Sequence, residues 1–529
     1  MNSTMKGHRS KMKQKRISAG VLALFGLLAV AATSASARQS VGGPDLSPYG
    51  ILNNSVANLH ASGGVIWAGP FLSNSADGGA SWYVPDSDSL FGTVNRLFSI
   101  DVEGDVIVAG LGRADRSGGE SIQTASGFLV SIDGGQSFQY RFPQLDGPEA
   151  DTQEYGVSIL PALPVIVPQQ SPPFDVDYDA ATEVLYVAGW ASGLRRSLDY
   201  GRNWERVVLP PDNLDAISPD QPYSFSLEPQ RGSNGSLNHM GFSVLVASDG
   251  TVWAGTAGGL NKSTDGGVGW QKFKADGTSS SLTGDWIISI EEQEMGSGSV
   301  IWTATWNTGE SGGGTGQFGV SFTSNGGQSF EQTLLGERIY DFAFDGNRVY
   351  AAGDGGLFMT DDGGRTWNSV NQFRDRTQPS RLVRQGSEVF SVEVDDGILW
   401  VGTSDGLLRS DDEAASWTLF RVDVPLHPDE PSSLAPDVDA FAYPNPFSPG
   451  EDRYVRIKYE TGSMQNIEIR IFDFGMNTVR TLRESGVDGV AESLWDGTDS
   501  RGMQVANGAY FYEIRAGSDR FRGKILVIE

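Results

Sequence analysis

The sequence predicts an all-β protein made of a seven-bladed β-propeller followed by a small β-sandwich. Three observations lead to this fold class. A turn-forming motif recurs seven times between residues 75 and 417. Short runs rich in Val, Ile, Trp and Tyr precede the copies, as is typical of β-strands. A differently patterned segment with further strand-like runs closes the chain.

The repeated motif reads Ser/Thr-x-Asp-x-Gly-x-x-Trp/Phe and is clearest at residues 263–270. A short polar side chain that binds its own backbone, followed by a glycine free to adopt positive φ, suits a tight turn between antiparallel strands. The aromatic residue is expected to fold back over that turn. Ala414 replaces the glycine in the seventh copy. The acid (or amide) and aromatic positions are Asp77 and Trp82, Asp133 and Phe138, Asp199 and Trp204, Asp265 and Trp270, Asn325 and Phe330, Asp362 and Trp367, and Asp412 and Trp417.

The strand-like runs before each motif are the basis for the blades. Residues 65–68, 300–303 and 399–401 are examples of an apolar second strand. Uneven spacing between copies fits a ring of blades with insertions better than a linear solenoid. Four strands per unit and seven units predict a seven-bladed propeller over residues 38–424.

The motif resembles the Asp box of sialidase-type, xyloglucanase-type and sortilin-like β-propellers, where it lies between the third and fourth strands of a blade. The resemblance implies that the box residues are structural and lie on the face away from the active site. Loops between second and third strands, and connections between blades, open on the other face. Most insertions of this chain fall in these connections: 111–125, 144–173, 210–237, 276–284, 309–317 and 371–386. Long loops on one face often carry binding sites, and the alternative is that they are tolerated surface insertions.

Catalytic signatures of these families are mostly missing. A sialidase resemblance would imply three arginines around a carboxylate, and only Arg96 and Arg338 are suitably placed. A xyloglucanase resemblance would imply two carboxylates across a cleft. Asp285 and Glu388 are the candidates, although rim carboxylates are expected by chance in so acidic a chain. The sequence therefore favours a non-catalytic protein, with a glycoside hydrolase as the alternative.

Aromatic residues are the more suggestive feature of the loops. Trp190 and Trp306 each follow a second strand, and Tyr223 and Phe225 lie between blades. Exposed aromatic faces suit sugar rings or peptide side chains, although these rings could equally pack under their own loops. Together with Arg96 and Arg338 they form the predicted ligand-binding set.

Composition excludes several classes of function. The 529 residues carry a formal net charge of −27 and no cysteine. The charge disfavours nucleic acid, and the lack of cysteine excludes disulfides and thiolate metal sites. The acidic run at 175–183 lacks the glycine and glutamate of a calcium loop, because Ala180 and Tyr186 occupy those positions. We predict no cofactor and no metal.

The N-terminus has the pattern of a secretory signal peptide over residues 1–37. Six Lys and Arg residues precede an apolar run at 21–32, and small residues follow up to Ala37. The apolar run is shorter than the roughly 20 residues of a membrane span. Cleavage near Ala37 would give a bacterial secreted or cell-surface protein with no transmembrane segment.

The last part of the chain is predicted to be a separate module. A proline-rich linker over residues 425–442 leads to a segment at 443–529, where alternation and turn signals indicate an Ig-like sandwich. Strands are expected at 454–459, 467–472, 478–482, 491–494, 509–516 and 524–528.

The motifs of this module resemble those of the flagellar-hook-capping Ig-like domain and the C-terminal sorting domain of type IX secretion. They are Tyr-Pro-Asn-Pro-Phe at 443–447, Trp-Asp-Gly-Thr-Asp at 495–499 and Asn-Gly-Ala-Tyr-Phe-Tyr at 507–512. The chain departs from the sorting pattern by ending on Glu529 instead of a basic residue. The resemblance implies secretion machinery as one partner, and the propeller is expected to bind a glycan or a protein. An assembly factor like the photosystem stability propellers is a further alternative, which the charge does not favour.

Overall fold

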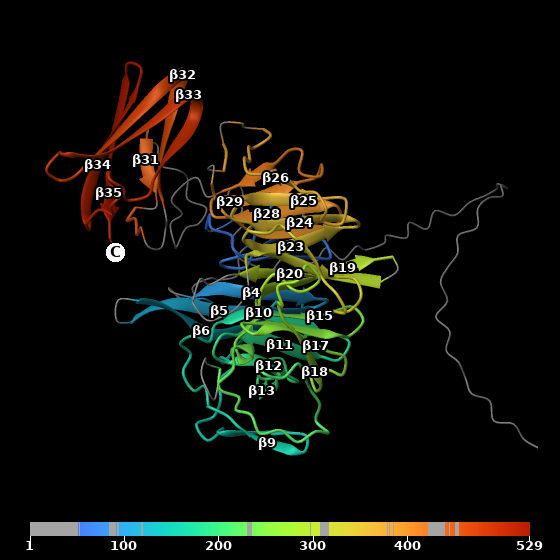
Figure 1. Ribbon diagram of the computed structural model, residues 1–529. Coiled ribbons are helices and arrows are strands. Elements are labelled where there is room, and N and C mark those ends of the chain that lie inside the picture. Colours follow the sequence, from blue (N-terminus) through green and yellow to red (C-terminus); the bar gives the residue numbers. More distant parts are fainter. Residues whose placement is uncertain are drawn as a thin grey trace, which may run out of the picture. The chain divides into compact units, whose positions relative to one another are not determined.

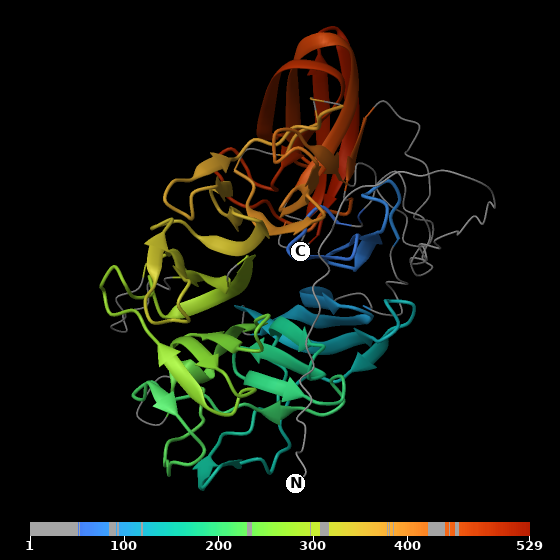
Figure 2. The ribbon, with the colours of Figure 1, turned by 90° about the vertical axis from the view of Figure 1, so that its right-hand side faces the viewer.

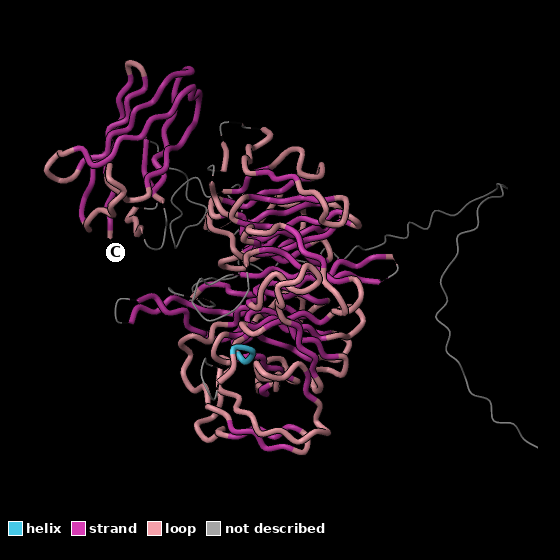
Figure 3. Tube along the Cα trace, viewed as in Figure 1, coloured by secondary structure: helices cyan, strands magenta, loops and turns pink. Residues whose placement is uncertain are grey.

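The computed structural model describes two stretches of the chain. They are residues 51–421 without 52, 84–90, 92–94, 118–119, 230–234, 297, 307–316, 378, 380 and 384–385, and residues 440–528 without 444 and 450–453. The predicted signal peptide, the linker up to residue 439 and nearly all of the insertion at 309–317 lie outside these residues. The helical content of the described part is a short 3-10 turn, η1 (Leu237–His239) (Figure 3). None of its helices is long and apolar enough to cross a membrane.

Seven antiparallel sheets follow one another along the chain, and the blade strands of each lie in sequence order from the first strand outward. We number them as blades 1 to 7. Figure 2 shows them arranged in a ring in sequence order, from blue to orange. Blades 1 to 3 consist of β1 (Leu59–Ser62), β2 (Val65–Ala68) and β3 (Ser73–Ser75); β4 (Arg96–Glu103), β5 (Val106–Ser117), β6 (Glu120–Ser131) and β7 (Gln139–Arg141); and β10 (Pro173–Asp179), β11 (Val184–Gly189), β12 (Gly193–Ser197) and β13 (Glu205–Arg206).

The remaining four blades repeat this plan. They consist of β15 (Gly241–Val246), β16 (Val252–Thr256), β17 (Gly259–Ser263) and β18 (Trp270–Phe273); β19 (Trp286–Met295), β20 (Gly298–Trp306), β21 (Gly319–Thr323) and β22 (Glu331–Thr333); β23 (Ile339–Asp345), β24 (Arg348–Gly353), β25 (Gly356–Thr360) and β26 (Asn368–Val370); and β27 (Val389–Asp395), β28 (Ile398–Thr403), β29 (Gly406–Ser410) and β30 (Thr418–Phe420). In blade 1, Tyr83 bridges Asn74 at the fourth-strand position. The predicted all-β propeller class is confirmed.

The motif turns join the third and fourth strands. In blade 4, the Ser263 hydroxyl donates to Asp265 (2.7 Å) and accepts from the amide of Gly267 (2.9 Å). Asp265 in turn accepts from the Gly269 amide (2.8 Å). Trp270 closes the turn by donating from its indole nitrogen to the Gly267 carbonyl (3.1 Å). The first three contacts recur in all seven copies, so one set of side chains satisfies the backbone of every turn.

Aromatic residues of these turns also join neighbouring blades. Trp82 of blade 1 packs edge-on against Trp400 and Phe420 of blade 7, with ring centroids 5.9 and 5.4 Å apart. This contact closes the ring. The same relation to the preceding blade is found for Phe138 with Trp67, Trp204 with Phe128, Phe330 with Phe273, and Trp367 with Trp302.

The ring has two faces, defined by which turns open on them. We call the face with the motif turns the box face, and the face with the second-to-third strand connections the loop face. Figure 1 shows the β5–β6 hairpin, a second-to-third connection, and the β19–β20 hairpin, a first-to-second connection, extending toward opposite sides. The strand order therefore places the motif turns on one face and the second-to-third strand connections on the other, as predicted.

The insertions were expected on the loop face, but three of them run over the outer edge of the ring. Within 144–173, a hairpin of β8 (Thr152–Tyr155) and β9 (Ser158–Pro161) reaches the blade 4 motif turn, where the Tyr155 hydroxyl donates to the Val268 carbonyl (2.8 Å). Within 210–237, β14 (Ala216–Ile217) pairs with β18. The insertion at 371–386 bridges Trp417 through Asp375. These contacts cover outer strands that would otherwise present unpaired edges.

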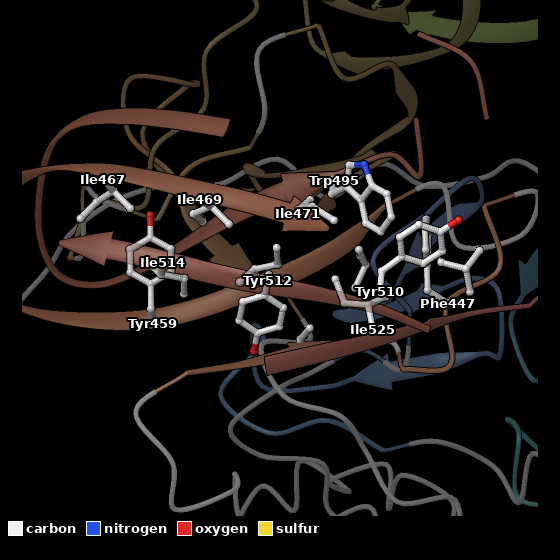
Figure 4. Packing of buried hydrophobic residues seen from close by; sticks show 14 of the residues in the cluster. Phe447, Tyr459, Ile467, Ile469, Ile471, Trp495, Tyr510, Tyr512, Ile514 and Ile525 are labelled. Carbon is white, nitrogen blue, oxygen red and sulfur yellow. The ribbon is translucent and has the colours of Figure 1, made fainter. Parts of the chain in front are cut away.

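The C-terminal segment folds into five antiparallel strands. They are β31 (Ala440–Tyr443), β32 (Val455–Phe472), β33 (Thr478–Trp495), β34 (Gly508–Ala516) and β35 (Asp519–Val527). The four strands expected between residues 454 and 494 are joined into two of 18 residues each, whose pairing continues past register shifts between Thr461 and Ile467. Figure 4 shows the core of this segment, in which Ile469, Trp495 and Ile514 are fully buried.

Candidate ligand site at the mouth of the central channel

The first strands of six blades share an irregularity near their loop-face ends. In each, one residue has no partner in the register with the second strand, which is a β-bulge. A bulge re-aims the side chain of the extra residue. Five of the six are aromatic, and the full set is Phe98, Phe174, Phe242, Ile288, Tyr340 and Phe390.

Aromatic side chains from these bulges gather in two groups on the loop face. In the first group, Phe242 contacts Phe174, Trp190 and Trp286, with centroid distances of 6.0, 5.1 and 5.3 Å. In the second, Tyr340 packs edge-on against Trp306 and Phe390, both at 5.6 Å. All these rings are only half-buried. We call the two groups together the aromatic rim.

Arg338 completes the second group of the rim. Its guanidinium lies 4.0 Å from the centroid of the Trp306 ring, a cation–π distance. It also lies 3.8 Å from the carboxylate of Asp354. Trp306 itself is fixed by donation from its indole nitrogen to the Ile339 carbonyl (3.1 Å). This part of the rim is held in place before any ligand arrives.

A cavity of about 560 Å³ lies in the channel that the first strands surround. Five of the six bulged residues contribute to its walls. Its size is within the range of about 300–1,000 Å³ that is usual for small-molecule pockets. Its lining contains eight carboxylates, one histidine (His60) and neither lysine nor arginine; the acids are Asp101, Asp175, Asp177, Glu291, Glu292, Glu294, Asp341 and Glu393.

Four of these carboxylates accept backbone N–H groups of the following blade and so link blade 2 to 3, blade 3 to 4 and blade 6 to 7. Asp101 accepts from Tyr178 (2.7 Å), and Asp177 accepts from Val246 (3.0 Å). Asp175 accepts from Val244, and Asp341 from Val392, both at 2.9 Å. Burial nevertheless raises the pKa of Asp175 and of Asp341 to about 7, because desolvation outweighs these hydrogen bonds.

Glu291 and Glu393 have fewer hydrogen-bond partners than these four carboxylates. Among the described residues Glu291 has no hydrogen bond or ion pair, and the carboxylate of Glu393 lies 4.0 Å from the Nδ1 atom of His60. Burial, together with repulsion from neighbouring carboxylates, raises the pKa of Glu291 and of Glu393 well above the usual range of glutamate. The channel therefore gathers acidic groups that the described residues do not pair with a lysine or arginine, and several of these groups are difficult to ionise. No group of three or more His, Asp or Glu in the described part of the chain is arranged to hold a metal ion.

Only some of the predicted binding residues reach this site. Trp190, Trp306 and Arg338 lie in the aromatic rim. Tyr223 and Phe225 lie elsewhere, because they pack against the core formed by the outer-edge insertions of blades 3 and 4. Arg96 lies over the ring of Phe71 in blade 1, 5.0 Å from its centroid.

The two candidate catalytic carboxylates are outside the channel lining. Asp285 precedes β19 and accepts from the backbone amide of Ala275 (2.8 Å), and burial raises its pKa. Glu388 precedes β27, and its backbone carbonyl accepts from the amide of Ser404 (3.0 Å). Neither lines the cavity with the eight acids.

The residues that sequence reasoning missed are the bulged aromatics and the channel acids. A signal was present: an aromatic residue is followed immediately by Ser or Asp at 98–99, 174–175, 242–243, 340–341 and 390–391. The short polar residue links to the next blade, as when Ser99 donates to the Pro173 carbonyl (2.9 Å). The shared dipeptide could have identified the aromatic bulges of five blades.

No protein-family model and no curated protein matches the sequence. Among solved structures, the chain is similar to PorZ, an essential bacterial surface component of the type-IX secretion system of Porphyromonas gingivalis, with 13% identity and a TM-score of 0.42. The match covers 90% of this chain and 66% of PorZ, so the chain spans less than two thirds of that protein. The GH74 xyloglucanase from Xanthomonas campestris has 13% identity and a TM-score of 0.49, covering 90% of this chain and 73% of that one. YCF48 from Cyanidioschyzon merolae has 15% identity and a TM-score of 0.36, with 76% and 98% covered.

Proposed function

We propose that this protein is an exported, non-catalytic binding protein that holds a glycan or protein ligand at the mouth of its central channel. The observation that carries the proposal is the aromatic rim, in which half-buried rings from four bulged first strands gather with Trp190, Trp286 and Trp306 on the loop face. Three of these bulged rings, Phe174, Tyr340 and Phe390, also line the cavity. Rigid aromatic side chains provide contact area at low entropic cost.

A binding-and-release screen tests this function. The purified protein is incubated with immobilised polysaccharides and secreted proteins, and both retention and released reducing sugar are measured. We expect retention without release, and at least about a tenfold loss of affinity when a central anchor, Trp190 or Trp306, is replaced by alanine. Val268→Ala on the box face is the matched control. Release of sugar would favour the glycoside hydrolase alternative, and retention unaffected by both tryptophan variants would reject the rim as the site.

We also propose that the motif turns are Asp boxes with a purely structural role, and that the C-terminal segment is an Ig-like module for type IX-like secretion or surface attachment. The first proposal is supported by the contacts of the turns with preceding blades. The second rests on the motifs at 443–447, 495–499 and 507–512. The signal-peptide pattern supports a secreted or cell-surface location.

A further inference from the structure

We propose that the central channel accepts a cationic side chain of a polypeptide ligand, lysine or arginine, that enters past the aromatic rim. This inference deepens the proposed function and rests on the same mouth. It selects a protein over a glycan as the ligand, because a neutral sugar would not compensate the carboxylates of the channel.

The first argument is charge. The cavity wall combines eight acids with one histidine and has no lysine or arginine of its own. Asp101 and Asp177 also line a second cavity of about 710 Å³, which reaches the blade 4 motif turn and includes one basic residue, Arg196. Low-dielectric walls of one sign focus the field and raise the local concentration of oppositely charged groups. A cationic ligand is therefore favoured, because a positive charge beside these acids stabilises their ionised form.

The second argument is an unused pair of polar groups on β19. Ser289 is 7% exposed and lines the cavity, yet its hydroxyl has no hydrogen-bond partner among the described residues. Glu291 lies two residues further along the same strand, and therefore on the same side, and is also without a partner there. A buried polar group without a partner costs free energy, so the pair is suited to receive the N–H donors of a ligand.

Comparison with other blades shows that Ser289 is unusual. The serines at the equivalent position after the bulge donate to a carbonyl of the following blade: Ser99 to Pro173, Ser243 to Ile287 and Ser391 to Val56, at 2.9, 3.2 and 3.4 Å. Ser289 has the same position after a bulge but no such bond. Its hydroxyl is therefore free to turn toward the channel.

The third argument is the chemistry of the entrance. Aromatic faces attract cations and exclude water, and the rim already holds one guanidinium in this way, that of Arg338 on Trp306. A lysine or arginine can bury its apolar stem against the rings while its charged head lies deeper, among the carboxylates. Rim and channel thus match the two parts of one side chain.

The test is calorimetric titration of the full chain with blocked pentapeptides at low salt. The probes are acetyl-Gly-Gly-Lys-Gly-Gly-amide, its arginine analogue, its Nζ-acetyl-lysine analogue and its glutamate analogue. We expect the first two to bind, with affinity falling as salt is added, and the last two not to bind. The relative affinity of the first two identifies the preferred cation. Absence of binding by both cationic peptides would overturn the proposal.

Matched variants locate the binding. Glu291→Gln should weaken binding of the cationic peptide about tenfold, because it removes a charged hydrogen-bond acceptor while keeping its shape. Ser289→Ala should weaken it less. Glu331→Gln, an exposed charge on the outer strand of the same blade, should change affinity less than twofold. If Glu291→Gln does not fold, Glu393→Gln replaces it. Equal losses for Glu291→Gln and Glu331→Gln would overturn the proposal in favour of general surface attraction.

Two further outcomes separate this inference from the proposed function. If the peptides fail to bind while a ligand from the screen still depends on Trp190 or Trp306, the cationic inference is wrong and the mouth remains the site. If millimolar Ca²⁺ binds wild type but not Glu291→Gln and displaces the peptide, the channel is a metal site and the inference is also wrong. Peptide binding lost in Glu291→Gln and unaffected by Ca²⁺ supports it.

Discussion

Ala414 shows how strongly a single motif position is constrained. It stands where the other six motifs have glycine, and its φ is +71°, in the left-handed region that L-residues rarely adopt. Its amide still donates to the Ser410 hydroxyl (3.0 Å), so the turn keeps its hydrogen bonds at the cost of backbone strain.

We predict that Ala414→Gly stabilises the propeller by about 1 kcal/mol, since relief of the strain outweighs the greater freedom of glycine in the unfolded chain. Denaturant unfolding measures the change. Ala415→Gly, at the exposed neighbouring residue, has no such strain to relieve and should be neutral or destabilising. A loss of stability in Ala414→Gly would mean that its buried methyl group matters more than its φ.

Trp270 is the residue that tests the structural role of the motif. It is 3% exposed and belongs to a core shared with Tyr186 of blade 3. We predict that Trp270→Ala lowers the free energy of unfolding by about 3–5 kcal/mol, as is usual for a buried aromatic residue, while folded molecules keep their ligand affinity. Val268→Ala in the same turn should change stability by less than about 0.5 kcal/mol. Lost binding with an unchanged melting temperature would place the ligand site on the box face.

At the scale of elements, the first strands have two roles. Carboxylates on these strands hold neighbouring blades together. Because the carboxylates lie close to one another, several of them are difficult to ionise. A group whose pKa is raised by folding stabilises the native state only while it is protonated. Stability contributed by these groups is therefore present at low pH and is lost as pH rises from the ordinary carboxylate range toward about 7, the pKa of Asp175 and Asp341.

We predict that Glu291→Gln raises the melting temperature at pH 8 and leaves it nearly unchanged at pH 4. At pH 8 the wild-type carboxylate is forced toward its charged form among other acids, whereas at pH 4 it is mostly protonated in both states, because pH 4 lies below the ordinary pKa of 4.5. A gain of about 1 kcal/mol would raise the melting temperature by roughly 2–4 °C in a domain of 150–250 residues, and somewhat less in a larger one. Glu331→Gln should give no such pH-dependent difference. An equal effect at both pH values would exclude charge crowding as the cause.

The insertion at 144–173 is anchored by a buried carboxylate. Asp146 bonds Arg195 and Arg206 and accepts from the amide of Val165 (2.8 Å). Asp146→Asn should destabilise the protein by about 3–5 kcal/mol, because it leaves two buried guanidinium groups without a countercharge. Thermal unfolding gives the size of the effect, and Asp151→Asn in the same insertion is a control expected to be neutral. A neutral Asp146→Asn would show that apolar packing alone holds the insertion.

Repeats and turns were predictable from the sequence because their chemistry is local. Side chains at 263, 265 and 270 contact backbone only a few residues away, so their spacing alone identifies the turn. Bulges depend on pairing with another strand, and the path of an insertion depends on which edge it covers. Trp190 and Trp306 were found because they follow recognisable strands. Glu291 was missed because nothing local distinguishes it from the other acids of the chain.

At the scale of the whole molecule, the acidic charge affects both solubility and partner choice. A net charge of −27 keeps copies apart and favours basic partners over acidic ones. The acids of the channel, which have no lysine or arginine beside them, favour a basic partner in the same way. Added salt should weaken the binding of a cationic ligand, because it screens the attraction between the ligand and these acids.

The C-terminal segment has its own core and is proposed to act in export. We predict that deletion of residues 443–529 leaves the propeller folded but prevents its appearance at the cell surface, if the sorting resemblance holds. Fractionation of the producing bacterium measures location, and thermal unfolding of the truncated protein verifies its fold. Normal surface appearance of a folded truncated protein would reduce the segment to a spacer or contact module.

Hydrogen exchange of the full chain, with and without saturating acetyl-Gly-Gly-Lys-Gly-Gly-amide, tests the central claim most directly. The claim is that ligand is held at the loop-face mouth of the channel. Slower exchange is predicted at the bulged segments around residues 98, 174, 242, 288, 340 and 390, with the seven motif turns unchanged. Protection of the motif turns with no change at the bulges would contradict it.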